Sequence, residues 1–262
     1  MSYLQPRPNT DTDTGTTNRG STRTTALNAA GAGARTRRKE ARPNEIVDAA
    51  LAEFVDKGFA GASVQAIAKR AGVSKGTVFV YFETKEDLFK AVVRANIAAP
   101  LNTWRDETRD YHGSTRDLVV HSMHQWWTDV GSTPAAGICK LLLQEAVNFP
   151  EIAAFYQEEV IEPGMLHMRA ILQRGVDRGE FKTTDLDTTG MNVFSPLLFL
   201  AMWQQAMGTD KPICGPAIDA REFIDNHARL MLDGICHTPA QATPPTAQAT
   251  NSTANNGMLG RS

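Results

Sequence analysis

The sequence has few cysteines and no long apolar run, and each shortage excludes a class of protein. Cys139, Cys214 and Cys236 are far apart and share no metal-ligand spacing, so we expect reduced thiols in a cytoplasmic protein. No apolar run approaches the ~20 residues of a membrane span, so we expect no membrane partner. The N-terminus lacks a hydrophobic block, which predicts that a secretory signal is absent.

Catalytic motifs are also scarce. No Gly-x-Ser-x-Gly occurs, and Gly31-Ala32-Gly33 lacks the preceding strand and following helix pattern of a phosphate loop. His121 and His124 have a spacing that metal ligands use, but no Glu or Cys stands beside them, which favours solvated or hydrogen-bonded histidines. We therefore expect no enzyme, no cofactor and no metal site.

The two parts of the chain carry net charges of opposite sign. Residues 1–94 carry 15 Lys and Arg against 10 Asp and Glu, whereas residues 95–262 carry 12 against 19. This imbalance fits a front part that meets phosphates and a rear part that avoids them. It would not identify a DNA-binding protein on its own.

The stretch from Ala62 to Lys85 has the pattern of two short helices joined by a tight turn. Ser63 can cap the first helix, whose apolar stripe is Val64, Ile67, Ala68 and Ala71. Gly72 follows that stripe, where a left-handed C-terminal conformation favours glycine. Ser74 can cap a second helix that starts at Lys75. Helix, glycine turn and helix is the helix-turn-helix pattern, and an ordinary helical hairpin is the alternative.

This stretch resembles the DNA-binding signature of the TetR/AcrR family of transcriptional regulators. The resemblance extends from about Pro43 to Arg94, and the residues that carry it are Ser63-Val64, Ile67-Ala68, Ala71-Gly72-Val73-Ser74, Gly76-Thr77, Tyr81-Phe82, Lys85-Glu86 and Leu88. It implies an all-α fold, in which a three-helix helix-turn-helix domain precedes a larger helical domain. In that family the larger domain binds a small-molecule effector, and its last two long helices form a homodimer.

The resemblance also implies roles for individual residues. Gln65, Lys75, Gly76, Thr77 and Phe79 match positions near base edges, and Tyr81 and Lys85 match positions that hold the DNA backbone. The complete candidate DNA-binding set is Ser63, Gln65, Ser74, Lys75, Gly76, Thr77, Phe79, Tyr81 and Lys85. Lys75 has the reach for guanine acceptors, the Thr77 methyl group for thymine, and Gly76 would provide clearance.

Four segments are predicted along the chain. They are a disordered basic arm (1–40), the DNA-binding domain (41–94), the effector-binding and dimerisation domain (95–237) and a disordered tail (238–262). Helical periodicity predicts helices from Pro43 to Gly58, from Thr84 past Pro100 to about Trp104, from Ser114 to Gly131, over 135–147, from Glu151 to Arg178, from Met191 to Met207 and from Ala217 to Leu232. Pro100 and Pro163 are expected to bend or break their helices.

The rear part contains an unusual set of large, soft side chains. They are Trp126, Trp127, Phe149, Phe155, Tyr156, Met165, Met168, Phe194, Phe199, Met202, Trp203 and Met207. Each alone is better explained by core packing, but as a group they suit an apolar cavity with a few polar groups, such as His167, Gln144, Asn148 or Gln204. Our candidate ligand-binding residues are Trp126, Trp127, Phe155, Met168 and Trp203, for a small apolar or aromatic effector.

These observations predict a ligand-responsive repressor that binds a near-palindromic double-stranded DNA operator as a homodimer. Two alternatives stay open at this point. The chain could be an activator or an effector-independent DNA binder, or it could be a helical ligand-binding protein or enzyme whose N-terminal unit contacts only protein.

Overall fold

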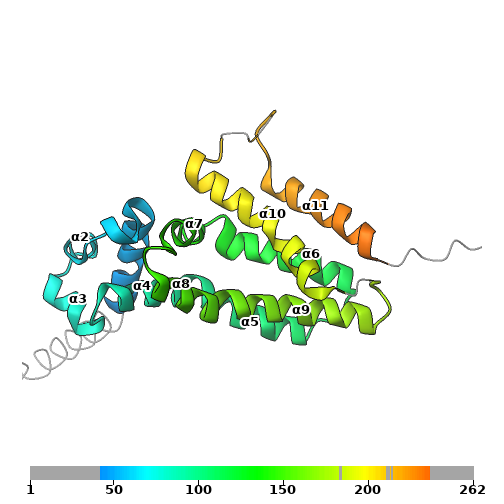
Figure 1. Ribbon diagram of the computed structural model, residues 1–262, viewed down its shortest axis with the longest axis horizontal. Coiled ribbons are helices and arrows are strands. Elements are labelled where there is room, and N and C mark those ends of the chain that lie inside the picture. The colour runs from blue at the N-terminus through cyan, green and yellow to red at the C-terminus, as the bar shows by residue number, and fades with distance from the viewer. Residues whose placement is uncertain (1–41, 183–184, 211–212, 214, 237–262) are drawn as a thin grey trace, which may run out of the picture. The chain divides into compact units, whose positions relative to one another are not determined.

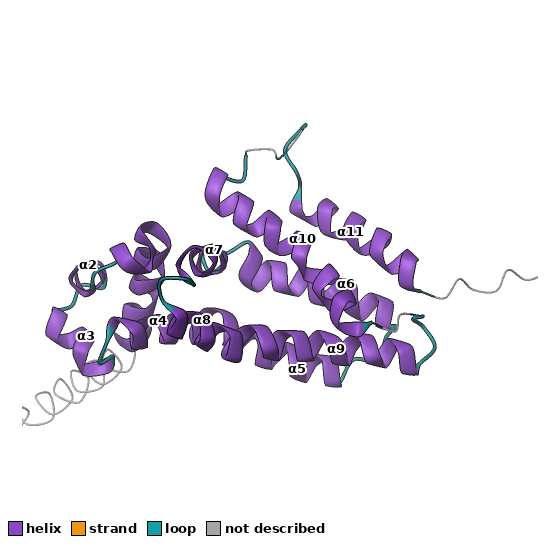
Figure 2. Ribbon diagram, viewed as in Figure 1, coloured by secondary structure: helices purple, strands orange, loops and turns teal. Residues whose placement is uncertain are grey.

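The computed structural model describes residues 42–182, 185–210, 213 and 215–236, and these form an all-helical fold (Figures 1 and 2). The predicted arm with its Arg35–Lys39 cluster, the predicted tail and Cys214 lie outside the described residues. In the described residues the one β-bridge joins Phe181 to Cys236. No helix there is long and apolar enough to cross a membrane.

The described helices follow one another in a simple order. Residues 42–61 are helical, and then come α2 (Val64–Arg70), α3 (Lys75–Tyr81), α4 (Lys85–Val93), the π-helical segment η1 (Arg94–Ala98), α5 (Ala99–Arg109), α6 (Thr115–Trp126), η2 (Trp127–Gly131), α7 (Ala136–Glu145), α8 (Pro150–Tyr156), η3 (Gln157–Ile161), α9 (Glu162–Asp177), α10 (Leu186–Met207) and α11 (Ala220–Ile235).

The chain divides into two compact units. Unit 1 contains the described residues up to Asn96 together with Leu141–Ala153, and unit 2 contains Ile97–Lys140 and the described residues from Ala154 on. Each unit has its own core, and the helices α7 and α8 contribute residues to both.

Four aromatic rings form the centre of unit 1. Phe59 stacks on Phe54 with ring centroids 5.7 Å apart, and Phe89 meets both rings edge-on at 5.4 and 5.2 Å. Phe149 packs against Phe59 at 4.8 Å. Gly58 has φ of 72°, a left-handed turn that returns Phe59 to the core. Helical residues continue to residue 61, beyond the expected end at Gly58.

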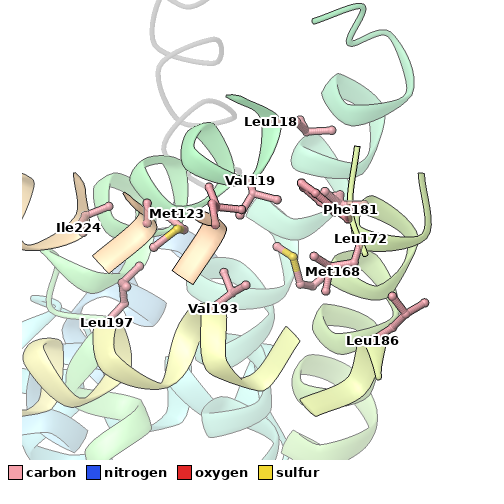
Figure 3. Close-up of a cluster of buried hydrophobic side chains, with 13 residues drawn as sticks. Leu118, Val119, Met123, Met168, Leu172, Phe181, Leu186, Val193, Leu197 and Ile224 are labelled. Atoms are coloured by element: carbon pink, nitrogen blue, oxygen red, sulfur yellow. The ribbon is translucent and has the colours of Figure 1, made fainter. Parts of the chain in front are cut away.

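Unit 2 has an apolar core between α6, α9, α10 and α11 (Figure 3). Figure 3 shows side chains of these helices gathered with Phe181, which follows α9. Phe181 lies over Gly175, where an added Cβ would be only 2.2 Å from the ring. Gly175 therefore permits this close approach.

Two π-helical segments, η1 and η3, directly precede a proline in the first turn of the next helix. Pro100 is the second residue of α5, and Pro163 is the second residue of α9. Because proline has no amide hydrogen, it leaves a carbonyl of the preceding turn without its α-helical partner, and a wider turn fits this gap. The chain therefore stays helical through Pro100 and through Pro163. The helix with Pro100 ends at Arg109 instead of near Trp104.

The last two helices begin at other residues than predicted, whereas α10 ends at Met207 as expected and α11 ends at Ile235. Asp185 caps α10 by accepting a hydrogen bond from Thr188 N at 3.0 Å, so this helix starts five residues before Met191. Asp219 caps α11 in the same way, which moves its start from Ala217 to Ala220. Within α10, Pro196 leaves the Asn192 carbonyl free of its helical partner, and His227 Nε2 of α11 donates to it at 3.0 Å.

Candidate nucleic-acid interface and effector cavity

Local capping positions the two helices of the helix-turn-helix. Ser63 Oγ accepts from Ala66 N at 3.2 Å, and Ser74 Oγ accepts from Thr77 N at 3.1 Å. Gly72 lies between the helices with φ of 67°. The predicted caps and the left-handed glycine are therefore confirmed. Ile67, Ala68 and Val78 are buried and fix the pair against the rest of unit 1.

The start of α3 is exposed and lacks bulk. Lys75 and Gly76 are exposed, and Thr77 is half-buried with its hydroxyl 2.8 Å from Ser74 Oγ. Lys75 Nζ lies 5.7 Å from the centre of the Phe79 ring, which is 43 % exposed. A helix N-terminus also presents amide hydrogens without helical partners, which attract negative charge.

Gly76 has no structural need to be glycine in the free protein. An added Cβ would lie 3.8 Å from Ser74 Oγ, which is an ordinary contact, and the backbone of Gly76 is not left-handed. The absence of a side chain therefore leaves room for something outside the chain. Gln65 and Ser63, in and before the first turn of α2, are likewise exposed.

Lys85 makes contacts that the sequence did not predict. Its ammonium group donates to the carbonyl oxygens of Phe59, Ala60 and Ala62 at 2.9, 3.5 and 3.3 Å. It also lies 4.5 Å from the centre of the Phe59 ring. Lys85 thus holds the end of the first helix, and a phosphate contact by the same group would compete with these bonds. Tyr81, at the end of α3, is half-buried.

A cavity of about 160 Å³ lies within unit 2. Its lining is mainly aliphatic and aromatic: Ile97, Leu101, Trp104, Trp126, Val130, Cys139, Tyr156, Val160, Ile161, Gly164, Met165, His167, Phe194 and Leu198. All three π-helical segments contribute, with Ile97 from η1, Val130 from η2 and two residues from η3. π-Helical turns occur often at functional sites, and here they converge on one cavity.

Three ionisable groups line the cavity, and burial perturbs each of them. Burial raises the pKa of Cys139, and it raises the pKa of Tyr156 well above its ordinary value. Cys139 Sγ lies 3.3 Å from the Tyr156 hydroxyl. Burial lowers the pKa of His167, and the nearby positive charge of Arg105 lowers it further. All three groups are therefore uncharged at neutral pH.

Of the five residues that the sequence suggested for ligand binding, Trp126 lines this cavity. Met168 is fully buried in the core of α6, α9, α10 and α11 (Figure 3). Trp127, Phe155 and Trp203 lie outside the lining. His167, suggested as a polar group, does line it. Leu101 and Trp104 also line the cavity and were missed, because every candidate that the sequence suggested lies at residue 126 or later.

The two histidines with metal-ligand spacing have other contacts. His124 Nε2 lies 2.6 Å from Asp225 Oδ1 of α11, and the His121 ring stacks with Tyr111. Among the described residues, no three His, Cys, Asp or Glu side chains are placed to hold a metal ion.

Comparison with known proteins identifies the family. Residues 46–92 match the model of bacterial regulatory proteins of the tetR family, and residues 110–213 match the C-terminal domain model of tetracyclin-repressor-like proteins. The chain belongs to the TetR family. It is therefore a helix-turn-helix DNA-binding transcriptional regulator and not an enzyme, which decides against the alternative whose N-terminal unit contacts only protein.

Relatives agree with this assignment. The TetR-family chain is 24 % identical over 147 residues to the fatty acid metabolism regulator protein of Bacillus subtilis, covering 55 % of this chain and 74 % of that one. It is 40 % identical over 78 residues to the regulator RutR of Escherichia coli K12, covering 29 % and 37 %. The fold matches that of Bacillus subtilis FadR, solved in complex with stearoyl-CoA, with a TM-score of 0.62, 20 % identity, and 73 % and 98 % coverage.

Proposed function

We propose that the protein is a homodimeric, ligand-responsive repressor that binds a near-palindromic operator. The observation that carries this proposal is the exposed, capped and unbulky start of α3. Two such helices related by a twofold axis would contact half-sites about one helical turn apart, or a multiple of that distance. DNA binding is the function of the family, and we propose that the protein acts in the cytoplasm.

Base recognition is assigned to the exposed residues of α2 and α3. Lys75 meets guanine acceptors, the Thr77 methyl group meets thymine, and Gly76 provides clearance. Gln65 and Phe79 flank them, and Ser63 and Ser74 hold the two helix ends. Tyr81 and Lys85 contact phosphates, with Lys85 exchanging intramolecular bonds for this contact. We assign these roles to residues 41–94, with residues 95–237 as the effector and dimer domain.

The dimer interface is proposed on α10 and α11. These helices expose large apolar side chains, from 50 % exposure at Phe199 to 63 % at Leu230, with Met191 and Met207 between these values. Apolar surface of this kind gains free energy when it is buried against a second copy. Continuity along two neighbouring helices suits an interface in which both copies present the same face.

The dimer is tested by sedimentation of two charge-introducing variants. Phe199→Glu and Leu230→Glu should shift the full chain toward the monomer and abolish operator binding, because a monomer has one helix-turn-helix and can bind only one half-site. Leu166→Glu is the matched control, because Leu166 in α9 is also 63 % exposed but lies outside the proposed face. An unchanged dimer in both interface variants would move the interface elsewhere.

The effector is proposed to occupy the unit 2 cavity. The cavity is largely apolar with few polar groups, as small-molecule sites are. The FadR complex with stearoyl-CoA supports small-molecule binding by this fold, and a long-chain acyl-CoA is therefore one probe to test. Ligand and operator should each lower the affinity of the protein for the other by the same factor.

One experiment tests the repressor proposal against an effector-independent activator. Operator fragments are first selected with the purified full chain, and their affinity is then measured by fluorescence anisotropy across a compound panel. A compound that lowers operator affinity and raises the melting temperature of the free protein would support the proposal. Unchanged operator affinity across the panel would favour the effector-independent alternative.

A further inference from the structure

We propose that the unit 2 cavity binds an uncharged molecule the size of one aromatic ring, carrying one hydrogen-bonding group, as in a substituted phenol. This inference rests on the proposed function, because it names the effector class for the cavity assigned there. It depends on the volume of the cavity, its lining and the polar groups in its wall.

The volume sets the size of the ligand. The cavity measures about 160 Å³. An engineered apolar cavity of about 150 Å³ in another protein binds benzene, whereas sites for drug-sized ligands measure about 300–1,000 Å³. One substituted ring therefore fills this cavity, and a long acyl chain exceeds it.

The wall favours an aromatic ligand. Trp104 and Trp126 line the cavity together with Phe194, and Met165 adds a polarisable sulfur. Aromatic rings pack edge-on or offset against one another and make favourable contacts with thioether sulfur. Trp104 keeps a fixed position, because its indole N–H donates to Asp129 Oδ2 at 2.8 Å.

The wall also selects against charge. No Asp, Glu, Lys or Arg lines the cavity, and its Cys139, Tyr156 and His167 are held uncharged by burial. A carboxylate placed there would lose its hydration, and no cation in the lining would replace it, because Arg105 acts on His167 from outside the lining and its guanidinium donates to the Pro163 carbonyl oxygen at 2.9 Å. A neutral ligand of the same shape does not have this free-energy cost of removing a charge from water.

Two polar groups are placed to meet one hydrogen-bonding group. The Tyr156 hydroxyl pairs with Cys139 Sγ at 3.3 Å, and a hydroxyl can both donate and accept. The His167 ring makes no hydrogen bond to any residue that the structure describes, and a neutral imidazole has one donor and one acceptor. A phenolic hydroxyl can therefore pair with His167, with Tyr156 as a second partner.

The test compares two ligands that differ mainly in charge. p-Cresol and p-toluate share a methyl-substituted ring, but at pH 7 the first is neutral and the second is an anion. Full-length protein is titrated with each, and tryptophan fluorescence and melting temperature are measured. We expect p-cresol to quench the fluorescence, raise the melting temperature and bind at least about tenfold more tightly than p-toluate.

Two glycine variants locate the binding site. Gly164 lines the cavity, and an added Cβ there would meet no atom within 4 Å, so Gly164→Leu should fold and abolish the p-cresol response. Gly61→Leu is the matched control, since Gly61 is exposed and lies in unit 1, where an added Cβ would make an ordinary contact 3.6 Å from Lys57 Cβ. His167→Leu is a second variant, which should weaken p-cresol binding about 2- to 12-fold and leave toluene binding unchanged.

The outcomes separate this inference from the proposed function. Equal or tighter binding of p-toluate, binding of a long-chain acyl-CoA in its place, or no binding of p-cresol would overturn the ligand class. A p-cresol response that survives in Gly164→Leu would also overturn it. If p-cresol binds as expected but leaves operator affinity unchanged, the ligand class stands and the effector role fails. If an acyl-CoA lowers operator affinity, the effector role stands and the ligand class fails.

Discussion

Replacing Gly76 by alanine adds one methyl group at the start of α3. This change distinguishes a role of Gly76 in folding from a role in DNA contact. In the free protein the new Cβ would lie 3.8 Å from Ser74 Oγ, an ordinary van der Waals distance. The backbone of Gly76 is not left-handed, so alanine adopts it without strain. The methyl group therefore has no partner in the chain that it must displace.

The expected effects on stability and on DNA affinity have opposite signs. Alanine is favoured over glycine within helices by about 0.5–1 kcal/mol, so the melting temperature of Gly76→Ala should stay the same or rise slightly. Against DNA, the methyl group would overfill a close contact. Overpacking costs about 1–3 kcal/mol, which corresponds to about a 5- to 150-fold loss of affinity for each half-site.

Thermal melting and operator anisotropy on the same sample measure both effects. Gly61→Ala is the matched control, because Gly61 is exposed, its added Cβ would make an ordinary contact 3.6 Å from Lys57 Cβ, and it is not in the candidate DNA-binding set, so this variant should keep parent affinity. Gly76→Ala with parent affinity and intact folding would refute close approach of α3 to DNA. A lower melting temperature would instead mean that Gly76 has a structural role.

Three further predictions follow from contacts within each unit. Lys85→Ala should lower the free energy of unfolding by about 1–3 kcal/mol, because the carbonyls at the end of the first helix lose their donor, and it should also reduce the salt dependence of DNA binding by about one unit; unchanged chemical denaturation would show that these bonds contribute nothing. Ser74→Ala should cost about 1 kcal/mol and Ser74→Gly only a few tenths, since a glycine tolerates the cap position; equal losses in denaturation experiments would argue against the cap. The folded-state pKa of His167 is lowered, so the unfolded chain binds its proton more readily, and stability should fall as the pH drops below about 6.5 toward the folded value; a melting series in His167→Leu should lose this part of the pH dependence.

The helix-turn-helix could be predicted from the sequence because its determinants are local. Ser63, Gly72 and Ser74 act within three residues of their own position, and the structure places each as expected. Long-range contacts of the same unit were not predictable in this way. Lys85 meets Phe59, which lies 26 residues earlier, and no periodicity indicates that pairing.

The cavity shows where helical periodicity stops being informative. The sequence favoured Phe155 and Met168, but the neighbouring Tyr156 and His167 line the cavity. The segment η3 lies between Tyr156 and His167, and its wider turn changes which side chains face the cavity. The two displacements are of one residue each but in opposite directions, so helical periodicity alone does not decide which of two adjacent large side chains faces the cavity. Pro100 and Pro163 were the only sequence signal of these wider turns, and on sequence grounds they predict bends or breaks.

Selection of DNA fragments with the purified full-length protein tests the central claim most directly, and Lys75→Ala is selected in parallel. We expect the parent to enrich a near-palindromic motif with half-sites about one helical turn apart, or a multiple of that distance, and the variant to lose preference at one position in each half-site. Enrichment of no motif, or of one without twofold symmetry, would contradict a dimer that recognises its operator through α3. An identical motif from Lys75→Ala would remove that residue from base recognition.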